Sequence, residues 1–354
     1  MELNELYFRK KVFVTGHTGF KGSWLVSVLS KLGAIVRGYA LPADDPDALF
    51  NLIGGEQICE SVFGDIRDKE NFKKQIVDFQ PDFIFHLAAQ PLVRLSYKSP
   101  LETFEVNAIG TVNLLEAVKE IARPISVVII TTDKVYYNNE WTYPYRENDR
   151  LGGFDPYSCS KACAELIVDC YRNSFFNPNS FSSHGKVIAT ARAGNVIGGG
   201  DRAKDRIIPD IIRSVETGNK LYIRNPYSIR PWQHVLESVY GYLLLGAKMK
   251  SDISLSTAWN FGPNQEDALT VQNIVQLAKG KWSDIDVLYE SDKNSFHETK
   301  TLKLDISKSL QELSWKPRWN SSIAIEQTFD WYHKSKKENP RELVFKQIEN
   351  YFNS

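Results

Sequence analysis

The sequence predicts an α/β fold in which a Rossmann-like, doubly wound parallel sheet carries a smaller C-terminal α+β lobe. Three observations lead to this prediction. Short β-branched runs alternate with longer helical patterns through the first half of the chain, as in repeated βαβ units. A glycine-rich turn follows the first of these runs. After about residue 195 the composition changes to loops rich in Gly, Pro and Arg, so the two halves differ in architecture.

The first half supplies the expected sheet and the helices that cover it. Its last two strands are continuous apolar runs, which are typical of strands buried on both faces. Connections between parallel strands are expected to be right-handed. The predicted strands are 11–14, 35–39, 83–87, 127–131 and 187–192, and the predicted helices are 22–32, 69–78 and 103–121. These segments predict a dinucleotide-binding domain over residues 1–194.

The second half, residues 195–354, is expected to form mainly a substrate-binding lobe, although a segment of it may return to the sheet. Helical patterns at 207–217 and 236–250 are separated by loops. Residues 279–301 are polar and expected to be rich in loops, and the tail from residue 326 is charged and helical.

Charge and composition exclude several function classes. Lys plus Arg and Asp plus Glu both count 43, so no global field attracts nucleic acid or an anionic membrane. The apolar stretches are far shorter than the ~20 residues that span a bilayer. The charged start of the chain does not resemble a signal peptide, so a cytoplasmic location is expected. The four cysteines are too sparse for a disulfide framework, and no metal site is expected.

The turn after the first strand carries Gly16, Gly19 and Gly22, with Thr18 and Phe20 between them. A tight bend and a close approach of backbone to pyrophosphate both require a missing side chain. The helix that follows offers its N-terminal N–H groups to the phosphates. Because the turn lies between a strand and an amphipathic helix, it predicts dinucleotide binding.

The choice between NAD and NADP stays open from these residues. The acidic residue that usually binds the ribose at the end of the second strand is absent, and Arg37 can be interpreted either as a 2′-phosphate ligand or as a solvated strand residue. Two further sets of residues follow apolar strands, at the places where the adenine edge and the central part of the cofactor are expected to lie. These candidate residues are Asp65, Ile66, Leu87, Ala88 and Ala89.

Tyr157 and Lys161 form the first candidate catalytic pair. Positions four apart share one face of a helix, so the ammonium of Lys161 is expected beside the phenol of Tyr157 and the nicotinamide ribose. A nearby cation favours phenolate and is expected to lower the tyrosine pKa from its usual ~10. Tyr157 then becomes a base for a hydroxyl group.

Thr132, Asp133 and Lys134 follow the apolar run that ends at residue 131. Polar residues at the carboxyl end of a parallel strand face the crevice where ligands bind. Thr132 is placed to hydrogen-bond a substrate hydroxyl. The adjacent acid and amine suit proton transfer at a second carbon, although an ion pair that caps a loop explains them equally well.

Taken together, these residues resemble the extended short-chain dehydrogenase/reductase family, whose signature combines TGxxGxxG, a Thr or Ser at a strand end, and YxxxK. The resemblance covers nearly the whole chain. Within the family, Asp133 followed by Lys134 looks like the 4,6-dehydratase branch that acts on CDP-linked sugars. Related dTDP-sugar dehydratases carry Asp-Glu there, and 4-epimerases lack the acid pair. Further segments similar to this branch are 16–25, 192–201, 223–226, 229–235, 259–263 and 302–305.

The resemblance implies a lyase that converts CDP-glucose into its 4-keto-6-deoxy product in a closed redox cycle with NAD. Tyr157 would remove the C4 hydroxyl proton beside Lys161, and Thr132 would orient that hydroxyl. Asp133 and Lys134 would then handle protons at C6 and C5. Which of the two is the acid is left open, and a zwitterionic pair that exchanges its proton on substrate binding is the alternative.

The nucleotide sugar is expected to contact Asn195, Arg206, Arg230 and His17. An arginine can hold phosphates by two parallel hydrogen bonds, and Arg230 in its Pro-flanked aromatic loop is the favoured candidate. His17 can equally fill the glycine turn. Arg202 departs from the branch pattern, which tends to have tryptophan there, and so leaves the exact sugar and base open.

Two rival enzymes share Tyr157 and Lys161: a nucleotide-sugar 4-epimerase and an NADP-dependent reductase. Asp133 and Lys134 argue against both. A non-catalytic dinucleotide sensor would keep the glycine turn but has no use for the catalytic set. The resemblance also implies a homodimer or homotetramer, paired through the helix that carries residues 157–171.

Overall fold

The computed structural model describes residues 3–267, 269–289 and 302–354, and the side chains of all of these except residues 229 and 230. It confirms the predicted fold class. A seven-stranded sheet runs in the order β11-β6-β5-β4-β1-β2-β3, and every pairing in it is parallel. The strands are β1 (Lys11–Thr15), β2 (Ile35–Ala40), β3 (Glu60–Phe63), β4 (Phe83–His86), β5 (Ile125–Ile130), β6 (Lys186–Ala193) and β11 (Ala258–Phe261).

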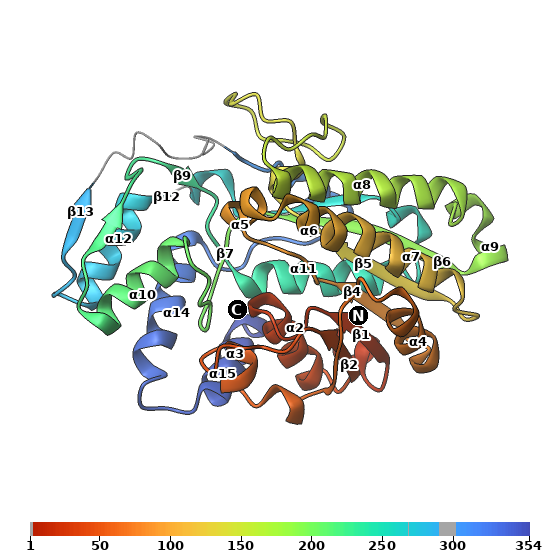
Figure 1. The fold of residues 1–354 in the computed structure, drawn as a ribbon, viewed down its shortest axis with the longest axis horizontal. Helices are drawn as coiled ribbons and strands as arrows, with labels where there is room; N and C mark the ends of the chain where they lie inside the picture. Colours follow the sequence, from red (N-terminus) through yellow and green to blue (C-terminus); the bar gives the residue numbers. More distant parts are fainter. Residues whose placement is uncertain (1–2, 268, 290–301) are drawn as a thin grey trace.

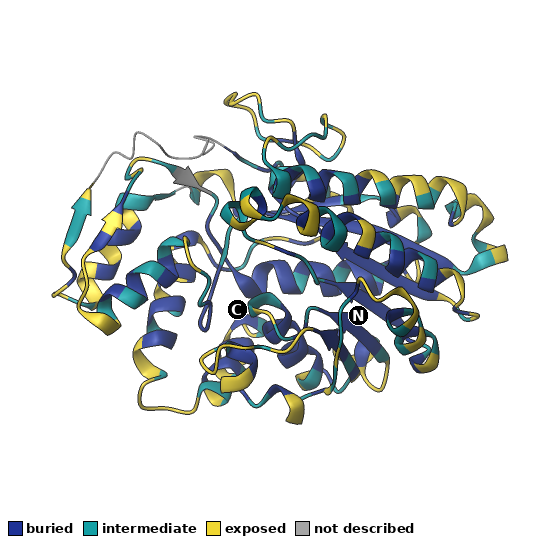
Figure 2. Cartoon of the chain, in the orientation of Figure 1, coloured by how far each residue is buried: buried dark blue, intermediate teal, exposed yellow. Residues whose placement is uncertain are grey.

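Helices cover both faces of this sheet (Figure 1). Successive β1 residues point to opposite faces, so Val12 and Val14 pack in one hydrophobic cluster and Phe13 in the other. The cluster around Val12 takes in α2 (Phe20–Lys31), α11 (Val235–Lys248) and α15 (Pro340–Phe352). The cluster around Phe13 takes in α4 (Lys69–Phe79), α7 (Gly110–Lys119) and α8 (Pro156–Ser174). Figure 2 shows the sheet buried between these layers.

The helix predicted over 103–121 is not regular. The structure has α6 (Pro100–Phe104), a π-helical turn η2 (Glu105–Ile109) and then α7. The π turn holds Asn107, whose Oδ1 accepts a hydrogen bond from the Gln90 backbone N–H at 2.8 Å and whose Nδ2 donates to Ser160 Oγ at 2.9 Å. The irregular turn therefore lets a buried amide join the loop after β4 to α8.

The elements after β6 build the second region, which occupies the left of Figure 1. They are β7 (Val196–Ile197), α10 (Ile207–Thr217), β8 (Leu221–Ile223), β9 (Ile229–Arg230), β10 (Gln233–His234), β12 (Leu269–Thr270), α12 (Val271–Lys281), β13 (Val287–Tyr289) and α14 (Ser321–Lys334). Shorter helices are α1 (Leu3–Tyr7), α3 (Leu49–Leu52), α5 (Val93–Lys98), α9 (Phe181–His184) and α13 (Ser307–Glu312).

Three of the later elements leave this region. β11 extends the sheet beside β6, α11 packs under β5, and α15 packs against α2. A division of the chain at residue 194 stays a prediction. The segment 279–301 was expected to be rich in loops, but part of it forms the strand β13. Residues 290–301 of this segment lie outside the described part. Within the described ranges, no helix has both the length and the apolar character needed to cross a bilayer.

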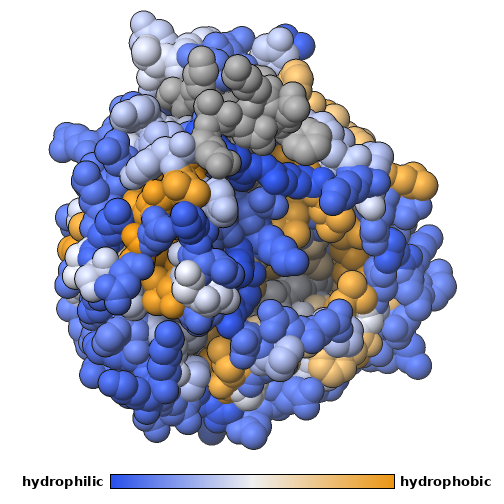
Figure 3. Space-filling view, turned by 60° about the vertical axis from the view of Figure 1, so that its left-hand side comes forward, coloured by the Kyte–Doolittle hydropathy of each residue, from blue (hydrophilic) through white to orange (hydrophobic). Residues whose placement is uncertain are grey.

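The strand order reverses between β1 and β4, because β1 pairs with β2 on one side and with β4 on the other. In open parallel sheets, ligands bind at the carboxyl ends of the strands beside such a reversal. The fold therefore brings the residues after β1, β4, β5 and β6 to a single edge. Seen from the side of the second region, the surface is mostly hydrophilic, with hydrophobic side chains around a hollow (Figure 3).

Candidate active site

The glycine turn after β1 has the geometry of a pyrophosphate cradle. Gly16 has φ +73°, and a Cβ there would lie 2.7 Å from the Ala88 backbone nitrogen. A Cβ on Gly22 would lie 2.1 Å from the Gly16 carbonyl oxygen. Gly19 is the N-cap of α2 and offers no side-chain hydrogen bond to it, so the first N–H groups of the helix stay available to an anion. These residues fit a bound dinucleotide.

The other candidate cofactor residues surround this turn. Thr18 Oγ1 donates to the Leu41 carbonyl at 2.9 Å and ties the turn to the loop after β2. Phe20 begins α2 beside Gly198. Thr15 Oγ1 accepts hydrogen bonds from the backbone N–H groups of Leu87 and Ala88, both at 3.1 Å. This fixes the start of the segment that leads into Ala89.

Asp65 and Ile66 follow β3. The Asp65 carboxylate pairs with Arg67 at 2.6 Å, and hydrogen bonds from Arg67 hold the pKa of Asp65 below its usual value. Ile66 is buried under Gly110. Arg37 pairs with Glu60 at 2.8 Å and lies over the Phe79 ring, so protein groups already contact its guanidinium.

His17 fills the turn instead of joining the candidate substrate residues. It is fully buried, its Nε2 lies 2.6 Å from Ser61 Oγ, and its ring packs edge-on against Phe50. A Cβ on Gly38 would collide with the ring. Burial lowers the pKa of His17 to about 4, so the side chain is neutral at physiological pH. Of the two roles left open from the sequence, the structure favours the packing role.

The structure brings Thr132, Tyr157 and Lys161 together. Thr132 follows β5 and caps the 3-10 turn η3 (Asp133–Val135), and its hydroxyl is close enough to the Tyr157 phenol to lower the pKa of that phenol. Tyr157 and Lys161 lie on α8 one helical turn apart. The Lys161 ammonium donates to the Ile130 carbonyl at 3.1 Å, at the end of β5. The strand end and the first turns of α8 therefore form one constellation.

The expected effect of Lys161 on Tyr157 is wrong for this structure. Burial raises the pKa of Tyr157 to about 12, and the groups that oppose it are the Thr132 hydroxyl and the charge of Arg206. Lys161 is itself affected, because burial and then the charge of Lys21 lower its pKa to about 8. Desolvation of the phenol dominates its pKa, which the one-turn spacing alone did not reveal.

Asp133 and Lys134 extend the constellation on the other side of Thr132. Asp133 is buried, and its Oδ1 accepts a hydrogen bond from the Thr132 hydroxyl at 3.0 Å. A Cβ on Gly194 would lie 3.2 Å from Asp133 Oδ2, so the end of β6 borders the carboxylate. Lys134 is half-buried, and its backbone N–H donates to Thr132 Oγ1 at 3.3 Å.

Lys21 was missed by the sequence analysis. Its ammonium donates to the Tyr242 hydroxyl at 3.1 Å, and burial and then the charge of Arg206 lower its pKa to about 8, against the attraction of Asp133. Its charge acts on Lys161, and the charge of Arg206 acts both on Lys21 and on Tyr157, so these three cations belong to one electrostatic cluster. One signal was available: Lys21 stands in the first turn of α2, where the helix dipole disfavours a cation.

The structure gives contacts for some of the candidate substrate residues of the second region but not for all of them. Arg206 approaches Tyr157 and pairs with Asp201 at 2.9 Å. Asn195 lies between β6 and β7, and its carbonyl accepts from the Gln233 N–H. Arg230 lies on β9, but its side chain is outside the described part. Arg202 pairs with Asp47 at 2.7 Å and with Glu216 at 2.9 Å, so carboxylates of the protein already match its charge.

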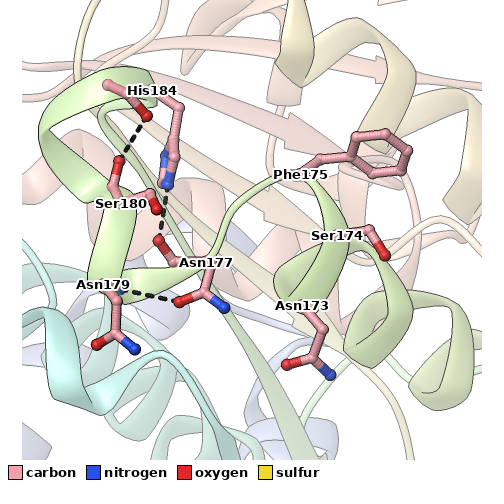
Figure 4. A pocket seen from close by; sticks show the side chains of 8 residues that line it. Asn173, Ser174, Phe175, Asn177, Asn179, Ser180 and His184 are labelled. Atoms are coloured by element: carbon pink, nitrogen blue, oxygen red, sulfur yellow. Dashed lines mark hydrogen bonds between the residues drawn. The ribbon is translucent and has the colours of Figure 1, made fainter.

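A separate cavity of about 450 Å³ lies at the opposite end of α8 (Figure 4). Polar side chains from the end of α8, from the connection that follows it and from α9 line it, including Asn177 and His184. The 19-residue helix between this cavity and Tyr157 is roughly 28 Å long. None of the candidate catalytic or cofactor residues lines it. Among the described residues, no group of three or more His, Cys, Asp or Glu side chains is arranged to hold a metal ion.

Comparison with known proteins fits this geometry. The family model described as GDP-mannose 4,6 dehydratase matches residues 13–328. The CDP-glucose 4,6-dehydratase of Salmonella typhimurium is 51% identical over 324 residues, which cover 91% of this chain and 90% of that protein. A dTDP-glucose 4,6-dehydratase of Xanthomonas campestris is 26% identical, with 90% of this chain and 92% of that protein covered.

Solved structures share the fold. The dTDP-glucose 4,6-dehydratase of Bacillus anthracis in complex with NAD superimposes with a TM-score of 0.75 at 23% identity, covering 93% of this chain and 98% of that one. An epimerase of Methanothermobacter thermautotrophicus gives a TM-score of 0.82 at 24% identity, covering 98% of this chain and 97% of that one. By the extent of these matches, the chain belongs to the GDP-mannose 4,6-dehydratase family.

Proposed function

We propose that this protein is an NAD-dependent lyase that converts CDP-glucose into CDP-4-keto-6-deoxyglucose and water. The observation that carries the proposal is the grouping of Thr132, Tyr157 and Lys161 with Asp133 and Lys134 at one edge of the sheet. The 51% identity to a CDP-glucose 4,6-dehydratase over nine-tenths of the chain supports the choice of substrate.

The cofactor residues act by shape and charge. The N-terminus of α2 and the glycine turn hold the pyrophosphate, and Ala88 allows the backbone to approach closely. The chemistry that NAD supplies when bound is reversible hydride exchange with the sugar. Lys21, Lys161 and Arg206 give the site a positive potential that suits a diphosphate, and the charge of Arg206 also favours the tyrosinate form of Tyr157.

The proposed proton transfers divide between two pairs. Tyr157 takes the C4 hydroxyl proton, with Thr132 orienting that hydroxyl, while the C4 hydride leaves. The resulting ketone acidifies the C5 proton, which Lys134 removes as Asp133 protonates the departing C6 hydroxyl. The hydride then returns to C6 and a proton to C5, so water is the single by-product and no net oxidation occurs.

The test is to incubate the purified protein with CDP-glucose, dTDP-glucose and GDP-mannose in deuterated water. We expect loss of one water and deuterium at C5 with CDP-glucose. Lys134→Ala should still exchange hydride at C4 but not eliminate water, whereas Tyr157→Phe should do neither. An epimerase would return an isomer of unchanged mass, a reductase would consume NADPH, and a sensor would leave all three sugars intact.

We also propose that two copies pair through α8. Leu101, Ile109 and Leu166 are 72%, 52% and 58% exposed and belong to α6, η2 and α8, which pack side by side. Light scattering should give twice the mass of the chain, and Leu166→Glu should give a monomer. An unchanged mass for this variant would argue against pairing through this face.

We also propose a cytoplasmic location, which the charged start of the chain favours, and a role in supplying deoxysugar for surface polysaccharide, which the family resemblance implies. Cell fractionation tests the first of these proposals. Loss of a 6-deoxy sugar from the surface polysaccharide of a deletion strain tests the second.

A further inference from the structure

Arg192, near the end of β6, and Glu165, on α8, form a buried pair behind the candidate site. Their side chains are 3% and 2% exposed. Arg192 Nε donates to Glu165 Oε1 at 2.9 Å, and Nη2 donates to Oε2 at 2.8 Å, so the pair is bidentate. Thr131 and Thr190 each donate a further hydrogen bond to the carboxylate, at 2.5 Å and 2.7 Å. Glu165 is therefore joined to β5 and β6 at once.

The remaining nitrogen of the same guanidinium faces a different segment. Arg192 Nη1 donates to the Tyr136 hydroxyl at 2.8 Å and to the Glu147 carbonyl at 2.9 Å. The Tyr136 hydroxyl in turn donates a hydrogen bond to Asn260 Oδ1 on β11 at 2.8 Å. Tyr136 is 2% exposed, so this contact is also shielded from water.

The two sides of this arginine lead to the two halves of the proposed reaction. Glu165 lies one helical turn after Lys161 and two turns after Tyr157 on the same helix. Tyr136 directly follows the 3-10 turn that carries Asp133 and Lys134. On one side the guanidinium therefore touches α8, which carries the hydride-transfer pair, Tyr157 and Lys161. On the other side it touches the residue that follows the turn of the elimination pair, Asp133 and Lys134.

A bidentate guanidinium fixes both distance and orientation, which a point charge on a flexible stem does not. Burial alone would raise the pKa of Glu165, but the charge and hydrogen bonds of Arg192 outweigh it and hold that pKa below its usual value. The pair thus stays charged, and each half constrains the other. A buried ion pair is weak evidence for net stability, which directs attention to the geometry that this pair imposes.

We propose that Arg192 is a positioning residue that keeps the hydride-transfer pair and the elimination pair in register, through Glu165 and Tyr136 separately. The inference rests on the proposed function, because it assigns one contact to each of its two steps. A displacement of about 1 Å at such a site costs up to roughly a hundredfold in rate. Loss of either contact should therefore slow mainly the step on its own side.

The experiment is a single turnover of the NAD-loaded enzyme with CDP-glucose, followed by the absorbance of reduced nicotinamide and by deuterium uptake at C5. Tyr136→Phe keeps the ring and removes its hydroxyl. We expect oxidation at the normal rate, elimination slowed about tenfold, and accumulation of reduced nicotinamide. Glu165→Gln should instead slow oxidation about tenfold without accumulation, and it should displace the pH profile of that step.

Two further variants complete the design. Arg192→Lys retains the charge but cannot serve Glu165 and Tyr136 together, so both steps should slow; it also decides the matter if Glu165→Gln does not fold. Tyr7→Phe removes another buried hydroxyl, which donates to the Leu243 carbonyl at 2.8 Å under α11, and should change neither step.

Equal slowing of both steps by Tyr136→Phe and by Glu165→Gln would overturn the inference, as would normal rates in both. These outcomes are distinct from failure of the proposed function. In that case the unmodified enzyme itself would not dehydrate CDP-glucose.

Discussion

Lys21 carries a positive charge into the first turn of α2, where the helix dipole is also positive. A cation is unfavourable at that position unless negative groups compensate it. Asp133 provides part of the compensation, while Arg206 and Lys161 add to the repulsion. The structure therefore places excess positive charge where the proposed diphosphate and tyrosinate need it.

This cluster predicts a proton balance for ligand binding. The pKa of Lys21 and that of Lys161 lie at about 8, lowered first by burial. A bound diphosphate favours the ammonium form and raises both values, so CDP binding at pH 8 should take up protons. At about pH 6 both lysines are already protonated, and uptake should vanish. Calorimetry in buffers of different ionisation enthalpy measures the effect.

Lys21→Met is the matched variant for this measurement and should reduce the uptake at pH 8. Proton release on CDP binding, or the same heat in every buffer at pH 8, would contradict the charge cluster.

Gly22 gives a second prediction at the residue scale. Because a Cβ there would lie 2.1 Å from the Gly16 carbonyl, Gly22→Ala should displace the turn. Overpacking of this kind costs about 1–3 kcal/mol, so NAD affinity should fall roughly tenfold or more in a fluorescence titration. Gly280→Ala on α12, where nothing lies within 4 Å of the added Cβ, should leave the affinity unchanged. Equal affinities for both variants would refute the cradle.

At the scale of elements, two sets of hydrogen bonds fix the start of α8. Ser160 on α8 receives the Asn107 amide from the π turn, and Asp155 caps the helix. Asp155 Oδ1 accepts from the Ser158 N–H at 3.0 Å, and its Oδ2 accepts from the Ser158 hydroxyl at 2.6 Å. The first turn, which contains Tyr157, is therefore fixed before any ligand binds.

Asp155→Ala should cost about 1 kcal/mol in the free energy of unfolding, measured in urea, because the cap is lost. Fraying of the first turn should also misplace Tyr157 and lower turnover. Asn320→Ala is the matched control, since Asn320 caps α14 by accepting from the Ile323 N–H at 2.9 Å. It should lose similar stability with normal turnover. An equal loss of turnover in both variants would count against a specific role for the α8 cap.

Across the whole molecule, Glu237 on α11 joins segments far apart in the chain. It is fully buried and accepts hydrogen bonds from the backbone N–H groups of Arg318 and Trp319, just before α14, and from the Tyr351 hydroxyl on α15. Arg318 in turn donates to the carbonyls at the end of α15. One carboxylate thus ties the C-terminal helices to the layer beneath the sheet.

Glu237 should make stability depend on pH. Burial raises its pKa to about 7, above the ordinary 4.5, so the folded state binds this proton more tightly than the unfolded state. The contribution to stability is full below 4.5 and is lost as pH rises through 7. Relative to Glu237→Gln, the wild type should lose about 2–3 kcal/mol between pH 5 and pH 8 in urea unfolding.

The exposed Glu326 on α14 provides the control for this effect, and Glu326→Gln should show no such dependence. A pH-independent difference between the wild type and Glu237→Gln would show that the buried group does not titrate in this range.

The sequence predicted the elements with strong periodicity and the residues whose spacing is set by a single element. β5 and β6 are buried along their whole length, as their apolar runs indicated. A strand was expected before Asp65 but its bounds were not predicted, because the residues of β3 are exposed or half-buried and do not form the apolar run that was assumed. The return of a later segment to the sheet was anticipated, but the position of β11 was not predicted, because its four residues carry too little periodicity.

The site residues also fall into those that local spacing predicts and those that only tertiary packing brings together. Tyr157, Lys161 and Thr132 are brought together by one helix and one strand end, and spacing alone revealed them. Arg192 and Glu165 meet only because α8 packs on β6, a contact that no local pattern encodes. The partners of Arg37 and Arg202 were equally invisible, since an isolated arginine gives no sign of which carboxylate it will find.

The place of β11 has a consequence for biosynthesis. This strand covers the outer edge of β6, but the ribosome makes it only after the whole segment 194–257 has been produced. Until then β6 is a long apolar strand with one edge of unpaired amides, the kind of surface on which chains aggregate. The nascent chain therefore depends on protection of β6 during translation, and a truncation before residue 258 should yield insoluble protein although every predicted dinucleotide-binding residue is present.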